Sequence, residues 1–507
     1  MSLRSLSKLD LVAAAFGLIV LHRYLTRKSK SSLPPGPPGL PIIGNVADMP
    51  TKKEWVTFAE WGKKWGGICS VNLLGRTMII INSSEVMSEL DKKGAIYSDR
   101  PRLEMGGELV GYSDTIVLLP YGQRFRAFRK YFANHLGPVP MENHIPTIQH
   151  ETHRFLKRQL SKPGDLMQNL RKLAGGIILQ LTYGITVEEG EDFFVNLIEG
   201  ANRNFNEATV PGAFPVDFFP SLRHLPEWLP GMGFMETART WAKATAAMVE
   251  VPFAFTKRQI ASGTAPPSFV ANLLEDEHTL SADEIRNIKF VASSMYAGAD
   301  TTVSAEYGFF LAMTLHPGVL EKAQQEIDTV IGNDRLPTLA DRPQLPYINA
   351  LVTEVLRWNS VAPTGVPHAS MEDGIIGGYL IPKGSIIVAN LWNMLHDPET
   401  YPDPFVFNPD RHIASNGKPA QQDPRTMCFG YGRRICAGMS LAEASLFAAI
   451  SMCLAVFDIK KAVENGIEVT PVHENTSGII SYPENFKCTI NPRSEKAVAL
   501  ISQEYQL

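Results

Sequence analysis

The stretch from Phe429 to Gly438 (FGYGRRICAG) constrains the fold most strongly, because it places glycines, arginines and one cysteine just before an apolar helical segment. Gly430 and Gly432 can adopt backbone angles that are closed to other residues, so the loop can curl and direct amide groups at the sulfur of Cys436. Nearby arginine and the amino terminus of a helix both stabilise a thiolate. Cys436 is therefore a candidate metal ligand, and the alternative is a buried cysteine after a glycine-rich turn.

A second unusual segment, Ala297–Thr302 (AGADTT), lies inside a long stretch with apolar residues at helical spacing. Glycine lacks a side chain and threonine can hydrogen-bond back to the preceding turn, so this helix can open locally at Gly298. The alternative is a mildly distorted buried helix in which the threonines only pack.

Composition and charge narrow the class of protein. Hydrophobic residues make up 44% of the chain and charged residues 20%, which excludes a collagen-like or disordered protein. A length of 507 residues predicts either two domains or one large cofactor-centred domain. The net charge of -4 gives no overall basic field, so we expect no nucleic-acid partner. The five scattered cysteines form no C-x-x-C pair and suggest neither a disulfide framework nor a structural zinc site.

An uninterrupted apolar run, residues 11–21 (LVAAAFGLIVL), precedes the basic residues Arg27, Lys28 and Lys30. A spanning helix needs about 20 residues and a signal-peptide core only about 7 to 15, so length alone allows both interpretations. A cleaved signal peptide ends in small residues, whereas this chain has TRKSKSS after its apolar run, which argues against cleavage. The positive charge downstream of the run keeps the following domain on the cytosolic side. We therefore expect a retained single-pass membrane anchor within residues 1–32.

A proline-rich stretch, residues 33–41 (LPPGPPGLP), follows the expected anchor. Prolines fix the backbone dihedral and remove hydrogen-bond donors, so the stretch predicts a stiff hinge that holds the body away from the bilayer. The alternative is an ordinary linker with no orienting role. We expect the catalytic domain to cover residues 33–507.

The remaining sequence is mostly helical, with a few short strands between glycine and proline turns. The expected helices are centred on residues 150–160, 291–315, 319–331, 348–358 and 440–457, and the expected strands lie at 78–81 and within 375–389. We find no Gly-x-Gly-x-x-Gly between a strand and a helix, so no nucleotide-binding domain is indicated.

The cysteine stretch resembles the haem-binding loop of the cytochrome P450 superfamily, whose pattern is Phe-x-x-Gly-x-Arg-x-Cys-x-Gly. The resemblance implies the cytochrome P450 fold, which is mainly α with small β sheets (α+β) in one large haem-centred domain. Cys436 would then be the axial thiolate ligand of haem b iron, which favours cleavage of an oxygen–oxygen bond. Phe429, Arg434 and Gly438 would bind the cofactor, and Gly438 would let the following helix approach the porphyrin.

The segment around Gly298 looks like the distal helix of the same family. The resemblance implies that Thr301, at the usual first-threonine position, or Thr302 orders the bound oxygen and that Asp300 relays protons.

Glu354 and Arg357 lie three residues apart on one helix face, and an exposed pair of this kind is worth only about 0.2–0.5 kcal/mol. The downstream stretch Phe407–Arg411 (FNPDR) resembles the segment that completes the family's buried Glu-Arg-Arg network. The resemblance assigns Glu354, Arg357 and Arg411 to core structure rather than chemistry.

Residues 121–129 resemble the family's haem-contacting helix, which usually has Trp where this chain has Phe125. Phe125 can stack but has no indole donor, whereas Arg129 retains the charge that binds a haem propionate. His368 and Arg434 match other propionate-binding positions. Each of these could instead be an ordinary basic residue.

The implied activity is an NADPH- and O2-dependent monooxygenase that inserts one oxygen atom into a C–H bond. Electrons would come from NADPH through a separate membrane-bound reductase, which docks on the cysteine side where Lys130 and Arg433 offer positive charge. The anchor would place the protein in the endoplasmic reticulum membrane with its catalytic domain facing the cytosol. Alternatives are a peroxide isomerase or dehydratase of the same fold, or a haem sensor or carrier; Asp300 and the two threonines favour the monooxygenase.

By resemblance, the substrate pocket is built from residues 103–118, 204–219, the start of the Asp300 helix, 361–366 and 476–480. These segments are largely apolar with scattered polar groups, which suits a mid-sized lipophilic molecule such as a terpenoid or aromatic natural product. The alternative for each is ordinary core or loop. The motifs PPGPPG and YSDRP are similar to those of fungal secondary-metabolism members of the family.

Overall fold

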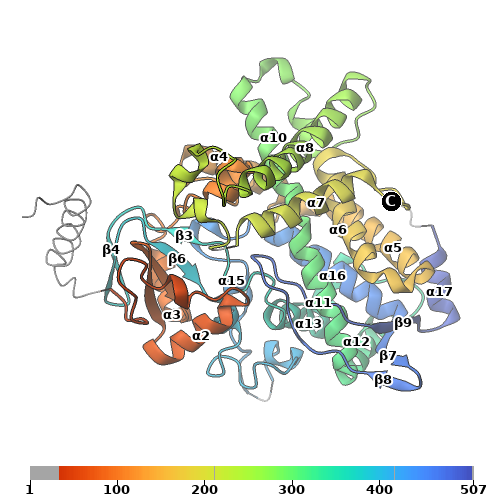
Figure 1. Cartoon of the computed structure of the whole chain (residues 1–507). Coiled ribbons are helices and arrows are strands. Elements are labelled where there is room, and N and C mark those ends of the chain that lie inside the picture. Colours follow the sequence, from red (N-terminus) through yellow and green to blue (C-terminus); the bar gives the residue numbers. More distant parts are fainter. Residues whose placement is uncertain (1–32, 211, 416, 505–507) are drawn as a thin grey trace, which may run out of the picture.

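The computed structural model describes residues 33–210, 212–415 and 417–504 (Figure 1). The expected membrane anchor at residues 1–32 lies outside the described residues. The helices are α2 (Glu54–Trp65), α3 (Ser84–Lys92), α4 (Gln123–Leu136), α5 (Ile145–Ser161), α6 (Leu166–Tyr183), α7 (Phe193–Ala208), α8 (Phe234–Ala261), α9 (Phe269–Leu273), α10 (Ala282–Ala297), α11 (Ala299–Leu315), α12 (Pro317–Val330), α13 (Pro346–Trp358), α14 (Leu391–Leu395), α15 (Arg425–Cys428), α16 (Met439–Val456) and α17 (Glu495–Ser502).

The strands form small sheets at the edge of the helical body (Figure 1). They are β1 (Ile68–Leu73), β2 (Arg76–Ile81), β3 (His368–Ala369), β4 (Gly374–Ile376), β5 (Tyr379–Ile381), β6 (Ile386–Ala389), β7 (Phe457–Glu464), β8 (Ile467–Val469) and β9 (Cys488–Pro492). The largest sheet has the order β1-β2-β6-β3, in which β2 and β6 are parallel and the other neighbours antiparallel. This mainly α architecture with small sheets is the one that the sequence predicts.

Two apolar helices, α11 and α16, form the centre of the largest hydrophobic cluster. α16 is apolar on all sides because it packs against α5, α11, α12 and α13, and most of its residues are buried. Among the described residues it is the one helix long and apolar enough to cross a membrane. Its burial identifies it as a core helix instead.

The helix that carries AGADTT is interrupted where the sequence predicts. α10 ends at Ala297 and α11 begins at Ala299, with Gly298 between them. The amide of Gly298 donates to the carbonyl of Met295 at 3.1 Å, a bond to the third preceding residue that tightens the turn. The interruption therefore lies about one turn before the two threonines.

A buried charge network fixes α13 to the segment before the cysteine loop. Glu354 and Arg357 are both fully buried and form two N–H···O bonds of 2.8 Å. Arg411 reaches the same carboxylate at 3.3 Å and His412 at 2.9 Å. Burial opposes ionisation of Glu354, but hydrogen bonds from Arg357 and His412 outweigh it and lower the pKa of the carboxyl. The core assignment is confirmed, and His412 is an additional member.

Glu306 on α11 is a buried acid of a different kind. Its side chain is 1% exposed, and neither carboxyl oxygen has a hydrogen-bond partner among the described residues. Burial holds the pKa of Glu306 well above its usual value, so the protonated form is favoured.

We expect Glu306→Gln to become more stable than the wild type as pH rises. Because the pKa of Glu306 is raised on folding, the unfolded chain releases this proton first, and stability falls by about 1.4 kcal/mol per pH unit until the folded group also ionises. Gln cannot ionise, so the stability of the variant does not fall with pH through this group. Thermal midpoints from mildly acidic to alkaline pH measure it. Glu321→Gln, at an exposed position on α12, is the control, and parallel profiles for all three proteins would contradict the prediction.

Candidate functional site

A cavity of ≈ 390 Å³ lies between α11 and the cysteine loop, and α4, α6, α7 and α16 supply further walls. Its lining is mostly apolar with a few polar and cationic groups, as is usual for a cofactor or small-molecule site. The lining includes every residue that the sequence predicts to bind the cofactor: Phe125, Arg129, His368, Phe429, Arg434, Cys436 and Gly438.

The cysteine loop presents the sulfur of Cys436 to this cavity. All five cysteines of the chain lie in the described part, and only Cys436 has an exposed side chain. Gly430 (φ 77°) and Gly432 (φ 61°) adopt the left-handed conformation that the curled loop requires. The amide of Cys436 donates to the carbonyl of Phe429 at 2.8 Å, which closes the loop around the sulfur.

The surroundings of Cys436 leave its charge incompletely compensated. The accessible surface of Cys436 opens into the cavity, which lies inside the protein, so burial still raises the pKa of the thiol, and the amide of Gly438 and the charge of Arg129 oppose this only in part. A bound metal cation would supply the missing positive charge and deprotonate the thiol outright. At Gly438 an added Cβ would meet no other atom within 4 Å, so the loop leaves room for a flat group beside the sulfur.

Three arginines line the cavity without an acidic partner. Arg100, Arg129 and Arg434 donate to backbone carbonyl oxygens at N···O distances of 2.6–3.3 Å. Within the described residues, none of them forms an ion pair with a carboxylate. Burial lowers the pKa of Arg100 to about 10 and that of Arg434 to about 9, because charged groups here are poorly solvated. The cluster therefore fits a ligand that brings its own carboxylates, as the two propionates of haem do.

Phe125 stacks on one of these cations. The guanidinium carbon of Arg434 lies 3.7 Å from the centroid of the Phe125 ring. The ring therefore holds the arginine side chain in place from α4, although it offers no donor of its own.

His368 is buried beside the same cluster. Its Nδ1 lies 2.7 Å from the carbonyl of Tyr97, and its ring stacks on Tyr431 at 4.5 Å. Burial and the charge of Arg100 hold the pKa of His368 well below its usual value. A neutral imidazole has one N–H donor, and at His368 it is Nδ1 that donates to the carbonyl of Tyr97. Nε2 can donate to a carboxylate only when the ring is protonated, and a negative charge in the cavity favours that protonated form.

The distal helix divides its candidate catalytic groups between two sides. Thr301 and Thr302 line the cavity, and Thr301 Oγ1 donates to the carbonyl of Gly298 at 2.9 Å. Asp300 is not among the lining residues, and its carbonyl accepts a bond of 2.9 Å from the hydroxyl of Tyr482. Burial raises the pKa of Asp300, with Tyr482 and Arg171 opposing.

Each segment predicted to surround the substrate contributes to the cavity wall. The contributing residues are Tyr112, Thr115, Ile116, Val117, Phe205, Ala299, Val361, Ala362, Thr364, Gly365, Val366, Ile479 and Ile480. Sequence reasoning missed Arg100 and Asn202, which also line it. Arg100 lies in the YSDRP motif, between Asp99 and Pro101, and that motif was the available signal.

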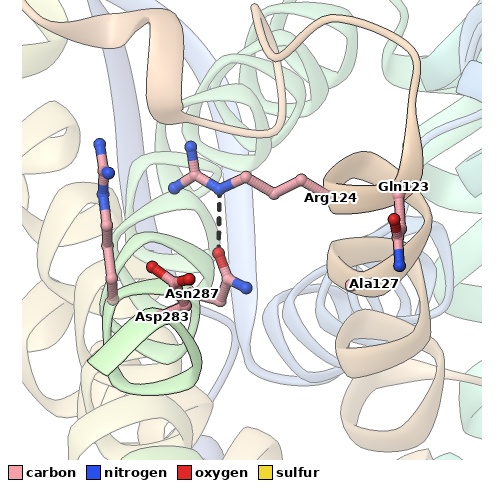
Figure 2. A pocket seen from close by; sticks show the side chains of 6 residues that line it. Gln123, Arg124, Ala127, Asp283 and Asn287 are labelled. Carbon is pink, nitrogen blue, oxygen red and sulfur yellow. Dashed lines mark hydrogen bonds between the residues drawn. The ribbon is translucent and has the colours of Figure 1, made fainter. Parts of the chain in front are cut away.

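A second, open recess of ≈ 460 Å³ lies between the starts of α4 and α10. Arg124 extends across it and donates to Asn287 at 2.9 Å (Figure 2). Arg124 and Arg286 both pair with Asp114. Because both arginines of the recess are paired with Asp114, we interpret it as a joint between helices rather than a second reaction site.

Comparisons with known proteins agree with this geometry. The family model described as Cytochrome P450 matches residues 34–490. Cytochrome P450 monooxygenase 208 of Postia placenta is 49% identical to this chain and covers 96% of both chains. Cytochrome P450 monooxygenase claR of Ampulloclitocybe clavipes is 44% identical, over 96% of this chain and 91% of the relative.

A third relative, Cytochrome P450 monooxygenase CLM2 of Gibberella zeae, is 42% identical over 97% of this chain and 95% of its own length. Both the match of the family model and the near full-length identity to fungal monooxygenases exceed what a shared fold alone would give. The chain belongs to the cytochrome P450 family and is a haem-thiolate monooxygenase.

Proposed function

We propose that residues 33–507 form one haem-centred catalytic domain in which Cys436 is the thiolate ligand of the iron. The observation that carries this assignment is the convergence of the exposed sulfur and three unpaired cations on one cavity. Arg100, Arg129 and Arg434, together with His368, would hold the two propionates. Phe429 and Gly438 would lie against the porphyrin, and Phe125 would hold Arg434 in position.

The bound haem supplies the redox chemistry that activates O2, with electrons from NADPH delivered by a separate reductase. The chain's own residues hold water and protons in place for that chemistry. Thr301 Oγ1 lies at the break in the helix, where it can exchange its bond to Gly298 for one to a molecule in the cavity. Asp300, one residue earlier, would supply protons from the other side of the helix, and Thr302 would complete the polar edge.

The reductase would dock on the cysteine side of the molecule. Lys130 in the middle of α4 and Arg433 in the cysteine loop are both exposed. Their positive charge would steer an acidic partner surface toward the shortest route to the sulfur.

The substrate would be a mid-sized lipophilic molecule, a terpenoid or aromatic compound of fungal secondary metabolism. The cavity wall opposite Cys436 is apolar apart from a few hydroxyl and amide groups, among them Asn202, Ser360 and Thr364. A ligand that is mainly hydrocarbon with one or two polar groups would match it. Purified protein can be screened against such compounds for shifts of the haem Soret band.

The apolar run at residues 11–21 would anchor the chain in the endoplasmic reticulum membrane, with the catalytic domain in the cytosol. The apolar run, the basic residues after it and the proline-rich hinge at 33–41 support this arrangement.

Cys436→Ser should abolish the thiolate-type absorption band of the reduced, carbon monoxide-treated protein and all NADPH-driven oxygenation, because a serine oxygen does not donate electron density as a thiolate does. The measurement is a reduced carbon monoxide difference spectrum. Cys428→Ser is the matched control, since Cys428 lines the same cavity and should keep the band. A serine variant that retains oxygenation would overturn the assignment.

Asp300→Asn should lower NADPH-driven product formation by about 10²-fold, the usual contribution of a positioned proton donor, and divert reduced oxygen to peroxide. Product and peroxide per NADPH consumed are measured together. Asp283→Asn, an exposed position on α10, is the control and should behave as the wild type. Unchanged coupling in Asp300→Asn would remove this residue from the mechanism.

Deletion of residues 1–32 should move the protein from the membrane to the soluble fraction of expressing cells while the carbon monoxide spectrum stays the same. The hydrophobic effect of an apolar span is lost, whereas every described haem-site residue remains. Membrane pellets washed with alkaline carbonate provide the measurement. Full retention of the deletion variant in washed membranes would contradict the proposed anchor.

A further inference from the structure

An ion pair between α6 and α7 lies on the side of Asp300 that faces away from the cavity. Arg171 Nη1 of α6 is 2.9 Å from Glu199 Oε2 of α7. The side chains are 31% and 15% exposed, so the pair connects the interior with solvent. Glu199 Oε1 and Arg171 Nε are buried and have no hydrogen-bond partner among the described residues. The pair therefore keeps one free acceptor and one free donor inside the protein.

Asp300 interacts electrostatically with both members of this pair. The charge of Arg171 lowers the pKa of Asp300 and of Glu199, and the charge of Asp300 raises that of Glu199. Burial is the largest effect and raises the pKa of both carboxyls, so each keeps its proton to a higher pH than an exposed carboxyl does. The hydroxyl of Tyr482 holds the backbone at Asp300 through its carbonyl.

Polar groups of α7 also bind the backbone around the helix break. Asn202 Nδ2 donates to the carbonyl of Ala297 at 3.4 Å, and Asn206 accepts from the amide of Ile480 at 3.3 Å. The first bond holds α7 against the residue just before Gly298, and the second holds α7 against the C-terminal segment that also lines the cavity.

We propose that Glu199 passes protons from solvent to Asp300 and that Arg171 positions the two carboxylates for this transfer. The proposal rests on the proposed role of Asp300. In each transfer the Glu199 carboxyl loses its proton to the Asp300 carboxylate and regains one from water, so charge and atoms balance. The two protons that accompany the two electrons from the reductase, when one oxygen atom of O2 becomes water, would enter by this route.

A purely structural ion pair is the competing interpretation. Partly exposed pairs contribute only about 0–1 kcal/mol, so this pair is not needed for folding. A structural pair this close to Asp300 would still shift its titration, so the turnover experiment is the one that separates the two interpretations.

Infrared titration tests the coupling without any substrate. The carbonyl stretch of the protonated Asp300 carboxyl is identified as the band lost in Asp300→Asn. Arg171→Gln should move its titration midpoint to higher pH because a neighbouring cation is gone, and Glu199→Gln should move it to lower pH because a neighbouring anion is gone. Glu207→Gln, an exposed position on the same helix, should leave the midpoint unchanged. Midpoints that are the same in all variants would overturn the proposal.

Turnover of the fluorogenic ether 7-ethoxycoumarin tests the proton route itself. With NADPH, reductase and O2, Glu199→Gln should turn over at least about tenfold more slowly than Glu207→Gln and show a larger solvent isotope effect, and Glu199→Asp should recover part of the rate. With hydrogen peroxide, which brings its own electrons and protons, Glu199→Gln and Glu207→Gln should match. An equal loss in both reactions would mean a structural role and would overturn the proposal.

The two proposals fail in distinguishable ways. If Asp300→Asn retains full coupling, the role of Asp300 itself is wrong. If Asp300→Asn uncouples the reaction but Glu199→Gln behaves as Glu207→Gln in both experiments, only the route through Glu199 is wrong. Should Glu199→Gln lose the carbon monoxide spectrum, Arg171→Lys and Arg171→Gln give the same comparison from the other partner.

Discussion

The site depends on a set of buried positive charges that form no ion pair with a carboxylate in the part of the chain that the structure describes. Arg100, Arg129 and Arg434 end at one cavity and are held by neutral carbonyl groups, while the Cys436 sulfur opens on the same space. Burying unpaired charge is expensive, and the cost is recovered only when anionic groups and a metal cation enter together. A haem supplies both, so cofactor binding should contribute directly to the stability of this region.

The rest of the core holds that arrangement in place from a distance. The two-point contact between Glu354 and Arg357 fixes α13, and Arg357 also donates to the carbonyl of Leu395 at 2.9 Å. Arg411 carries the network into the segment that precedes the cysteine loop. A fully buried network of this kind specifies one arrangement of the segments it joins, because a displaced member would leave a charge unpaired. The glycine conformations in the loop then place the sulfur.

The sequence predicted the features whose chemistry is local. Short motifs predicted three features: the glycine conformations at 430 and 432, the interruption at Gly298 and the position of the cofactor residues around the cavity. Each depends mainly on residues that are neighbours in the sequence. Properties set by distant segments were missed. Arg100 is held by carbonyls from residues 117, 366 and 367, and the burial of Glu306 depends on helices packed around α11. Neither could be derived from neighbours in sequence.

The position of Asp300 shows why spacing alone does not give mechanism. On an α-helix each residue points about 100° away from the one before it, so Asp300 lies about 200° around the axis from Thr302, and Thr301 and Thr302 are the two that line the cavity. The acid faces α6 and α7, where Arg171 and Glu199 lie. A proton delivered through Asp300 must therefore pass around the helix at the point where Gly298 interrupts the backbone bonding. On the proposed route, the interruption at Gly298 is the point where protons from the α6–α7 side would reach the side of the helix that Thr301 and Thr302 present to the cavity.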